Sequence, residues 1–209
     1  MIEYRIHQGK YMKKEKKVIG ISGGIASGKS QVSAYIKNKG YQVFDCDNIS
    51  HYIFEKEEVK KEISDRFNID IKDVNRKNIA SIVFNDKELL NVLNDIMRKR
   101  IIDEMKDIIL KHEDIIFFDV PLLSDWALYD MFDKVIFVYV NKETQIERLK
   151  NRDSIDNNYA NNKIKAQIDI DKKLEIAKER CDIIIDNNSN IDDLYLKIDE
   201  VLKEIEDEI

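Results

Sequence analysis

The fold follows from one stretch near the start of the chain, Val18-Ile-Gly-Ile-Ser-Gly-Gly-Ile-Ala-Ser-Gly-Lys29-Ser30. A short β-branched apolar run gives way to G-x-x-x-x-G-K-S, and apolar residues at helical spacing follow. This order predicts a strand, a phosphate-binding loop and a helix. The alternative is a glycine-rich turn with a surface lysine, but it leaves the agreement of all fixed positions unexplained.

Each fixed position of the loop has a physical reason. Glycine is needed where a Cβ would keep main-chain N–H groups from converging on phosphate oxygens, or where φ is positive. The helix that follows directs its free N–H groups and positive end to the same anion. Lys29 would place its ammonium against the β- and γ-phosphates, and the Ser30 hydroxyl would be a ligand of Mg²⁺. The residues expected to hold a nucleotide are Gly23, Gly24, Ala26, Ser27, Gly28, Lys29, Ser30 and Gln31.

Composition limits the function classes. A chain of 209 residues is long enough for one α/β domain with an insertion, expected over 17–209. The formal net charge of −6 argues against a dedicated nucleic-acid surface. No run approaches the ~18 apolar residues of a membrane span, and Cys46 and Cys181 favour a reducing compartment over a disulfide framework. Residues 1–16 end in a basic run and are expected to be a flexible extension.

Two aspartates follow the second predicted strand, Tyr41–Phe44. Asp45 and Asp47 lie at the carboxyl end of this strand, the edge at which open α/β sheets bind ligands. Asp47 could instead cap the helix predicted to follow, but one cap needs one carboxylate, so the pair favours a function. From about 48 to 112 the chain is almost wholly helical, with one long helix expected over 86–112, and this segment reads as an insertion forming one wall of a cleft.

Further candidates follow the later strands. Asp119 comes directly after the apolar run Ile115–Phe118, as a Walker B carboxylate on the Mg²⁺ side would; a turn aspartate is the alternative. Arg148 and Arg152 share a helix face and could clamp phosphate oxygens, or could pair with neighbouring carboxylates. A polar segment near 154–162 is consistent with a mobile loop over a site.

The same motifs support a family resemblance. Ile21–Ser30 is similar to the opening G-L-T-G-G-I-G-S-G-K-S of the dephospho-coenzyme A kinase family, and Phe44-Asp-Cys-Asp47 resembles its D-A-D element. Later signatures follow in the same order, and the match runs from about residue 18 to 202. They are Asp119-Val-Pro-Leu-Leu, Thr144-Gln-x-x-Arg-x-x-x-Arg-Asp153, Ala166-Gln167 and Cys181-Asp-Ile-Ile-Ile-Asp-Asn187.

This resemblance implies a three-layer α/β P-loop kinase fold with a central parallel five-stranded sheet. The implied reaction transfers the γ-phosphoryl group of ATP to the ribose 3′-hydroxyl of dephospho-CoA. Asp47 would be the base with Asp45 beside it, and Lys29 and Arg148 would be the other catalytic residues. ATP would also contact Arg152 and Asn187, dephospho-CoA would contact Leu122 and Leu123, and Mg²⁺ would be held by Ser30 and Asp119.

The resemblance also bears on organisation. The helical insertion would hold the acceptor, and a lid would lie at about 151–165. We expect a monomeric cytoplasmic enzyme with no nucleic-acid or membrane partner. Arg98-Lys99 stands where the family usually has His-Pro, Ala26 replaces a loop glycine, and the family's lysine could be either Lys172 or Lys173.

Other functions fit less well. The runner-up is a P-loop kinase of another small substrate, such as a nucleoside or nucleotide. A signalling GTPase is disfavoured because Asn141-Lys-Glu-Thr144 lacks the last aspartate of N-K-x-D, and Asp119-Val-Pro-Leu122 lacks the glycine of D-x-x-G. A non-catalytic binding module would leave the phosphate-binding residues unexplained.

Overall fold

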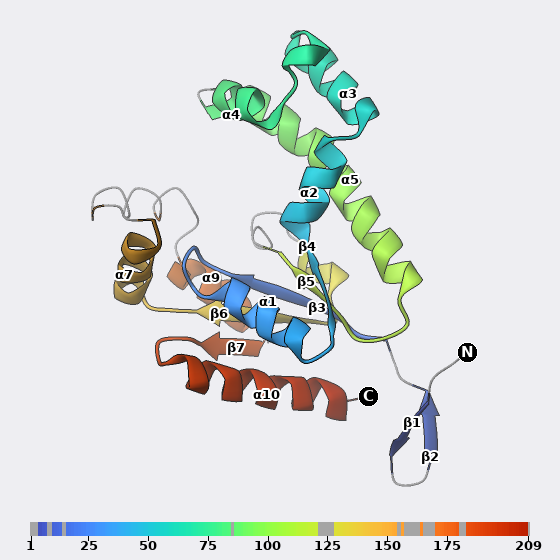
Figure 1. The fold of residues 1–209 in the computed structure, drawn as a ribbon, viewed down its shortest axis with the longest axis vertical. Coiled ribbons are helices and arrows are strands. Elements are labelled where there is room, and N and C mark those ends of the chain that lie inside the picture. The colour runs from blue at the N-terminus through green and yellow to red at the C-terminus, as the bar shows by residue number, and fades with distance from the viewer. Residues whose placement is uncertain are drawn as a thin grey trace. The chain divides into compact units, whose positions relative to one another are not determined.

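The computed structural model describes residues 4–7, 10–13, 16–84, 86–120, 128–153, 156, 164, 170–179 and 183–208. The chain divides into two compact units (Figure 1). Unit 1 comprises Met1–Asp45 and His112–Ile209, and unit 2 is Cys46–Lys111. Unit 2 is therefore almost the same segment as the helical insertion expected from the sequence.

Unit 1 contains a five-stranded sheet in the order β4-β5-β3-β6-β7, and each neighbouring pair is parallel. This confirms the predicted parallel sheet, with the strand that precedes the phosphate loop at its centre. Central strands buried on both faces read as continuous apolar runs, which is why β5 and β6 show little alternation. The strands are β3 (Val18–Gly23), β4 (Gln42–Asp45), β5 (Ile116–Asp119), β6 (Lys134–Tyr139) and β7 (Ile183–Asp186).

Helices cover both faces of this sheet (Figure 1). Helices α1 (Lys29–Asn38) and α10 (Ile191–Asp207) pack on the face that carries Val138. Helix α9 (Ile170–Glu179) packs on the other face, where Ala177 joins Phe137. Successive strand residues point to opposite faces, so Phe137 and Val138 belong to different core clusters. A 3₁₀ turn, η2 (Leu128–Met131), precedes β6, and helix α7 (Lys142–Asp153) follows it.

A separate hairpin lies in the segment, residues 1–16, that is expected to be a flexible extension. Strands β1 (Tyr4–His7) and β2 (Lys10–Lys13) pair antiparallel, with Tyr4 opposite Lys13. The sequence between them is only Gln8-Gly9. A two-residue connection with glycine favours a tight hairpin, a signal that the sequence reading passed over.

Unit 2 is helical, and its helices α2, α3 and α4 pack against α5. Its core includes the buried side chains of Ile53, Ile63, Ile101 and Met105. Helix α5 is the single long helix expected over 86–112, and it runs unbroken past Lys99, the position at which the family resemblance would lead one to expect a helix-breaking proline. The elements are α2 (Cys46–Phe54), α3 (Glu57–Phe67), η1 (Ile71–Asp73), α4 (Arg76–Phe84) and α5 (Lys87–Lys111).

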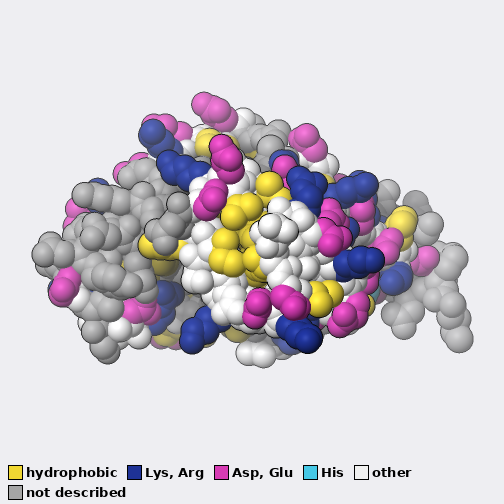
Figure 2. Space-filling model, turned by 90° about the horizontal axis from the view of Figure 1, so that it is seen from above, with side chains coloured by type: hydrophobic (Ala, Val, Ile, Leu, Met, Phe, Trp, Pro, Cys, Tyr) yellow, Lys and Arg dark blue, Asp and Glu magenta, His cyan; other side chains and the backbone are white. Residues whose placement is uncertain are grey.

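One face of the molecule carries both signs of charge. On the face seen in Figure 2, Lys and Arg side chains are interspersed with Asp and Glu, and the coloured atoms carry no continuous basic stripe. Across the described ranges, no helix is long and apolar enough to cross a membrane.

Candidate active site

The phosphate loop connects β3 to α1 at the carboxyl end of the central strand. Gly28 has φ +94° and forms the N-cap of α1. A Cβ on Gly23 would lie 2.6 Å from Ser27 Oγ and 2.8 Å from the main-chain oxygen of Val138, so glycine lets the loop approach β6 closely. Ala26, where the family has glycine, also adopts a positive φ of 58°.

Side chains from distant segments hold the main-chain carbonyls of this loop. Asn187 Nδ2 donates to the oxygen of Ser27 at 2.8 Å, and Gln145 Nε2 donates to the oxygen of Ile25 at 2.7 Å. Both amide side chains are buried. Because C=O and the next N–H point in opposite directions across a planar peptide, these bonds also orient the N–H groups that follow Ile25 and Ser27. The loop is therefore preorganised by contacts from α7 and from the residue after β7.

Lys29 and Ser33 reach the same carboxylate from one face of α1. The Lys29 ammonium pairs with Asp119 Oδ1, and Ser33 Oγ donates to Asp119 Oδ2 at 2.7 Å. Asp119 is buried at the end of β5, and its neighbour Val120 donates its N–H to Ile21 of the central strand at 2.8 Å. Asp119 is therefore placed beside the phosphate loop, as expected of a Walker B carboxylate.

The two aspartates of the D-x-D element lie in different parts of the structure. Asp45 ends β4 in register with Asp119 on β5, so the two carboxylates point to the same face of the sheet from strands that lie roughly 5 Å apart. Asp47 lies in the first turn of α2, which belongs to unit 2. Both Asp45 and Asp47 are exposed.

The two arginines of α7 have different surroundings. The Arg148 guanidinium donates to the main-chain oxygen of Asn187 at 2.8 Å, and to that of Ser27 at 3.5 Å. It therefore lies at the phosphate loop. Arg152 pairs with Asp153, with Nε 2.8 Å from Oδ1, which is the ion pair that the sequence left open as an alternative.

A pocket of about 260 Å³ opens beside the start of α1. Four of the residues expected to bind the nucleotide line it together with Ser189 and Ile191; they are Gly28, Gln31, Arg148 and Asn187. The structure thus brings residues from 28 to 187 to one place next to the phosphate loop.

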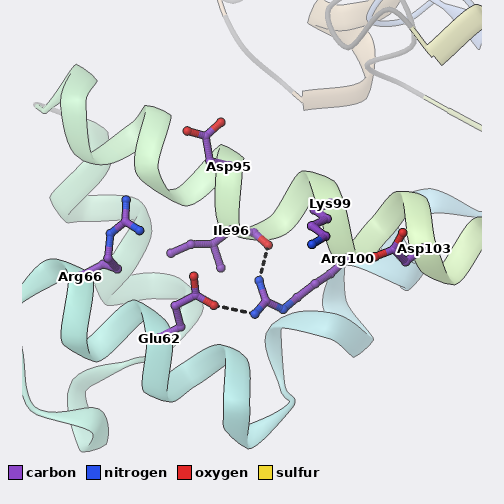
Figure 3. A pocket seen from close by; sticks show the side chains of 7 residues that line it. All are labelled: Glu62, Arg66, Asp95, Ile96, Lys99, Arg100 and Asp103. Atoms are coloured by element: carbon purple, nitrogen blue, oxygen red, sulfur yellow. Dashed lines mark hydrogen bonds and ion pairs between the residues drawn. The ribbon is translucent and has the colours of Figure 1, made fainter.

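A larger pocket of about 570 Å³ lies within unit 2, between α3 and α5 (Figure 3). Arg100 joins the two helices there: one guanidinium nitrogen is 2.5 Å from Glu62 Oε2, and another donates to the oxygen of Ile96 at 2.8 Å. Lys99, one of the two residues that replace His-Pro, lines this pocket too. Its lining mixes both signs of charge.

Some sequence expectations fall elsewhere. Leu122 and Leu123 lie outside the described residues, as does most of the lid expected over 151–165. Of the two candidate lysines on α9, Lys173 is buried and Lys172 is exposed.

Two residues of the site, Gln145 and Ser33, were not predicted from the sequence to have a role. Gln145 stands inside the Thr-Gln-x-x-Arg signature, which was its only signal. Ser33 stands one helical turn after Lys29, so its place on the same helix face was the available clue.

Comparisons with known proteins place the chain among kinases. The profile of the dephospho-CoA kinase family, CoaE, matches residues 17–193. A dephospho-CoA kinase of Fusobacterium nucleatum is 39% identical over 187 residues, covering 87% of this chain and 95% of the relative. One of Oceanobacillus iheyensis is 34% identical over 195 residues, covering 89% and 96%. The solved structure of a dephospho-CoA kinase from Campylobacter jejuni is 29% identical with a TM-score of 0.69, covering 92% of this chain and 98% of that one.

Proposed function

This chain belongs to the dephospho-CoA kinase family, and from that premise we propose how its own residues carry out the ATP-dependent phosphorylation of dephospho-CoA. The observation that carries the proposal is the preorganised phosphate loop with Lys29 and Asp119 beside it. Phosphoryl transfer depends on positioning and on neutralising the charge of the transferring group, and these residues supply both.

ATP binds with its phosphates in the loop and its nucleoside part in the 260 Å³ pocket beside α1. The N–H groups of the loop and of the first turn of α1 donate to the phosphate oxygens. Lys29 places its ammonium on the β- and γ-phosphates, and Arg148 stabilises the charge of the transferring group. Arg152 acts with it once its pairing with Asp153 is exchanged for phosphate.

The donor atoms at the loop suit Mg²⁺. This ion prefers oxygen ligands and is usually held by one or two carboxylates together with substrate phosphates. The Asp119 carboxylate and the Ser30 hydroxyl would supply such oxygen ligands, together with the phosphates of ATP. When bound there, Mg²⁺ would neutralise part of the negative charge of the phosphates.

Asp47 acts as the base that accepts the proton of the ribose 3′-hydroxyl, with Asp45 helping to orient the hydroxyl. The helical insertion holds the acceptor, with Leu122 and Leu123 in contact with it, and the segment 151–165 closes over the site. We propose a monomeric cytoplasmic enzyme that binds neither nucleic acid nor membranes. The net charge of −6 argues against a nucleic-acid partner, and so do the mixed charges of the coloured atoms on the face seen in Figure 2.

The direct test incubates the protein with Mg-ATP and a panel of acceptors: dephospho-CoA, adenosine and nucleotides. Coenzyme A should form, and no other acceptor should be phosphorylated at a comparable kcat/KM. Phosphorylation of a nucleoside at the higher rate would instead support the runner-up kinase, which the relatives' names do not favour.

Two variants test the residue roles. Asp47→Asn should lower kcat by ~10²–10⁴ while ATP binding stays nearly unchanged, because only proton transfer is lost. Lys29→Ala should lower kcat/KM by removing transition-state stabilisation. A wild-type turnover of Asp47→Asn in the coenzyme A assay would remove Asp47 from the role of base.

A further inference from the structure

We propose that Ser33 is a positioning residue that fixes the orientation of the Asp119 carboxylate toward Mg-ATP. This inference rests on the proposed function, because it takes Asp119 to lie on the metal side of the phosphates. It concerns a residue for which the phosphate-loop motif prescribes no role, since the motif ends at Ser30.

The contact itself is well defined. Ser33 Oγ lies 2.7 Å from Asp119 Oδ2, and both residues are buried. Lys29 and Ser33 are four residues apart on α1, so their side chains stack on one face and meet the two oxygens of one carboxylate. Hydrogen bonds with an ionised partner are short and about twice as strong as neutral ones.

Lys29 must release Asp119 when it binds the phosphates, whereas Ser33 can keep its hydrogen bond. Lys29 has a flexible side chain with three N–H donors, and in the proposed function its ammonium also binds the β- and γ-phosphates. The terminal torsion of an aspartate is soft, so a carboxylate released by Lys29 would rotate unless a second group held it. The Ser33 hydroxyl sits on a short side chain of a buried helix face. It therefore keeps Oδ2 fixed and leaves Oδ1 directed at the ligand.

The experiment measures how much Mg²⁺ strengthens ATP binding. The dissociation constant for ATP is determined by calorimetry in EDTA and in Mg²⁺ for the wild type, Ser33→Ala, Ser33→Thr and Asp119→Asn. In Ser33→Ala the EDTA value should stay within about twofold, and the gain from Mg²⁺ should fall by ~10-fold, as is typical when a residue behind a metal ligand is removed. Ser33→Thr keeps the hydroxyl and should restore the gain.

The kinetic readout should agree. Ser33→Ala should lower kcat by ~10-fold with the KM for dephospho-CoA nearly unchanged, and adding it to Asp119→Asn should have no further effect. Ser81→Ala is the matched control, because Ser81 is an exposed helical serine of unit 2 whose hydroxyl donates to the oxygen of Asn78. It should leave the dissociation constants for ATP, and the gain from Mg²⁺, unchanged.

The outcomes separate the two ideas. If Asp119→Asn loses the gain from Mg²⁺ while Ser33→Ala keeps it, the role of Ser33 is wrong and the proposed function stands. If Asp119→Asn also keeps the gain, the metal-side role of Asp119 is wrong, and the inference falls with it. A lower melting temperature of Ser33→Ala with an unchanged gain would reduce Ser33 to a structural contact.

Discussion

Replacing Gly28 by alanine tests the fit between the phosphate loop and Asn187. The new Cβ would lie 2.2 Å from Asn187 Nδ2, far below any normal contact, at a residue with φ +94°. Asn187 is buried and bonded to Ser27, so it can move aside only by giving up that hydrogen bond. The backbone strain costs about 1–2 kcal/mol, and the lost buried bond costs about 1–3 kcal/mol. Gly28→Ala should thus lower the free energy of unfolding by roughly 2–5 kcal/mol.

Two comparisons isolate the steric part. Gly40 has φ +97°, and a Cβ there would meet nothing within 4 Å, so Gly40→Ala should cost only the strain, about 1–2 kcal/mol. In an Asn187→Ala background, Gly28→Ala should cost no more than Gly40→Ala. Urea unfolding followed by circular dichroism measures all four variants. Strictly additive costs of Gly28→Ala and Asn187→Ala would refute the argument, because residues that clash must couple.

Three further predictions concern stability. Ala26→Gly should raise the free energy of unfolding by about 0.5–1 kcal/mol, because glycine adopts the positive φ of 58° without strain. The control Ala34→Gly within α1 should lower the free energy of unfolding by about 1 kcal/mol. If both variants are less stable than the wild type, Ala26 is not strained. A hydrogen bond from the Lys39 ammonium lowers the pKa of Asp199 in the folded protein. The ionised Asp199 therefore stabilises the fold above the ordinary pKa of 3.8, and this stabilisation is lost as pH falls through the lower pKa of the folded state. Asp199→Asn should accordingly make the melting temperature fall less steeply below about pH 4. Arg100→Met should lower the free energy of unfolding by no more than about 1 kcal/mol in low salt and less at high salt, since its pair with Glu62 is partly exposed; a salt-independent loss would assign the effect to packing.

The features that could be predicted from the sequence are those set by residues close together along the chain. The phosphate loop, the long α5 helix and the apolar strands are encoded in local spacing and were predicted with small shifts of their ends. For example, α5 runs from Lys87 to Lys111, one residue inside the expected range of 86–112 at each end.

What could not be predicted depends on contacts across the fold. Ser33 meets a carboxylate 86 residues away, and Gln145 meets a carbonyl 120 residues away, so local spacing could not identify the partner of either residue. The D-x-D spacing predicted that Asp45 and Asp47 lie together at the end of one strand. In the structure Asp45 ends β4, whereas Asp47 lies in the first turn of α2, which belongs to unit 2. The sequence left open whether Arg152 binds phosphate or pairs with a neighbouring carboxylate. In the structure it pairs with Asp153.

The place of β3 in the sheet has a consequence for the synthesis of the protein on the ribosome. Val18 pairs with Ile116, and Ile19 pairs with Lys134, so the first strand of the sheet to emerge has no neighbour until about a hundred more residues are made. At ~5–20 residues per second this takes roughly 5–20 s, during which an apolar strand with two open edges is exposed to other nascent chains. The yield of folded protein should therefore depend on elongation rate and chaperone supply.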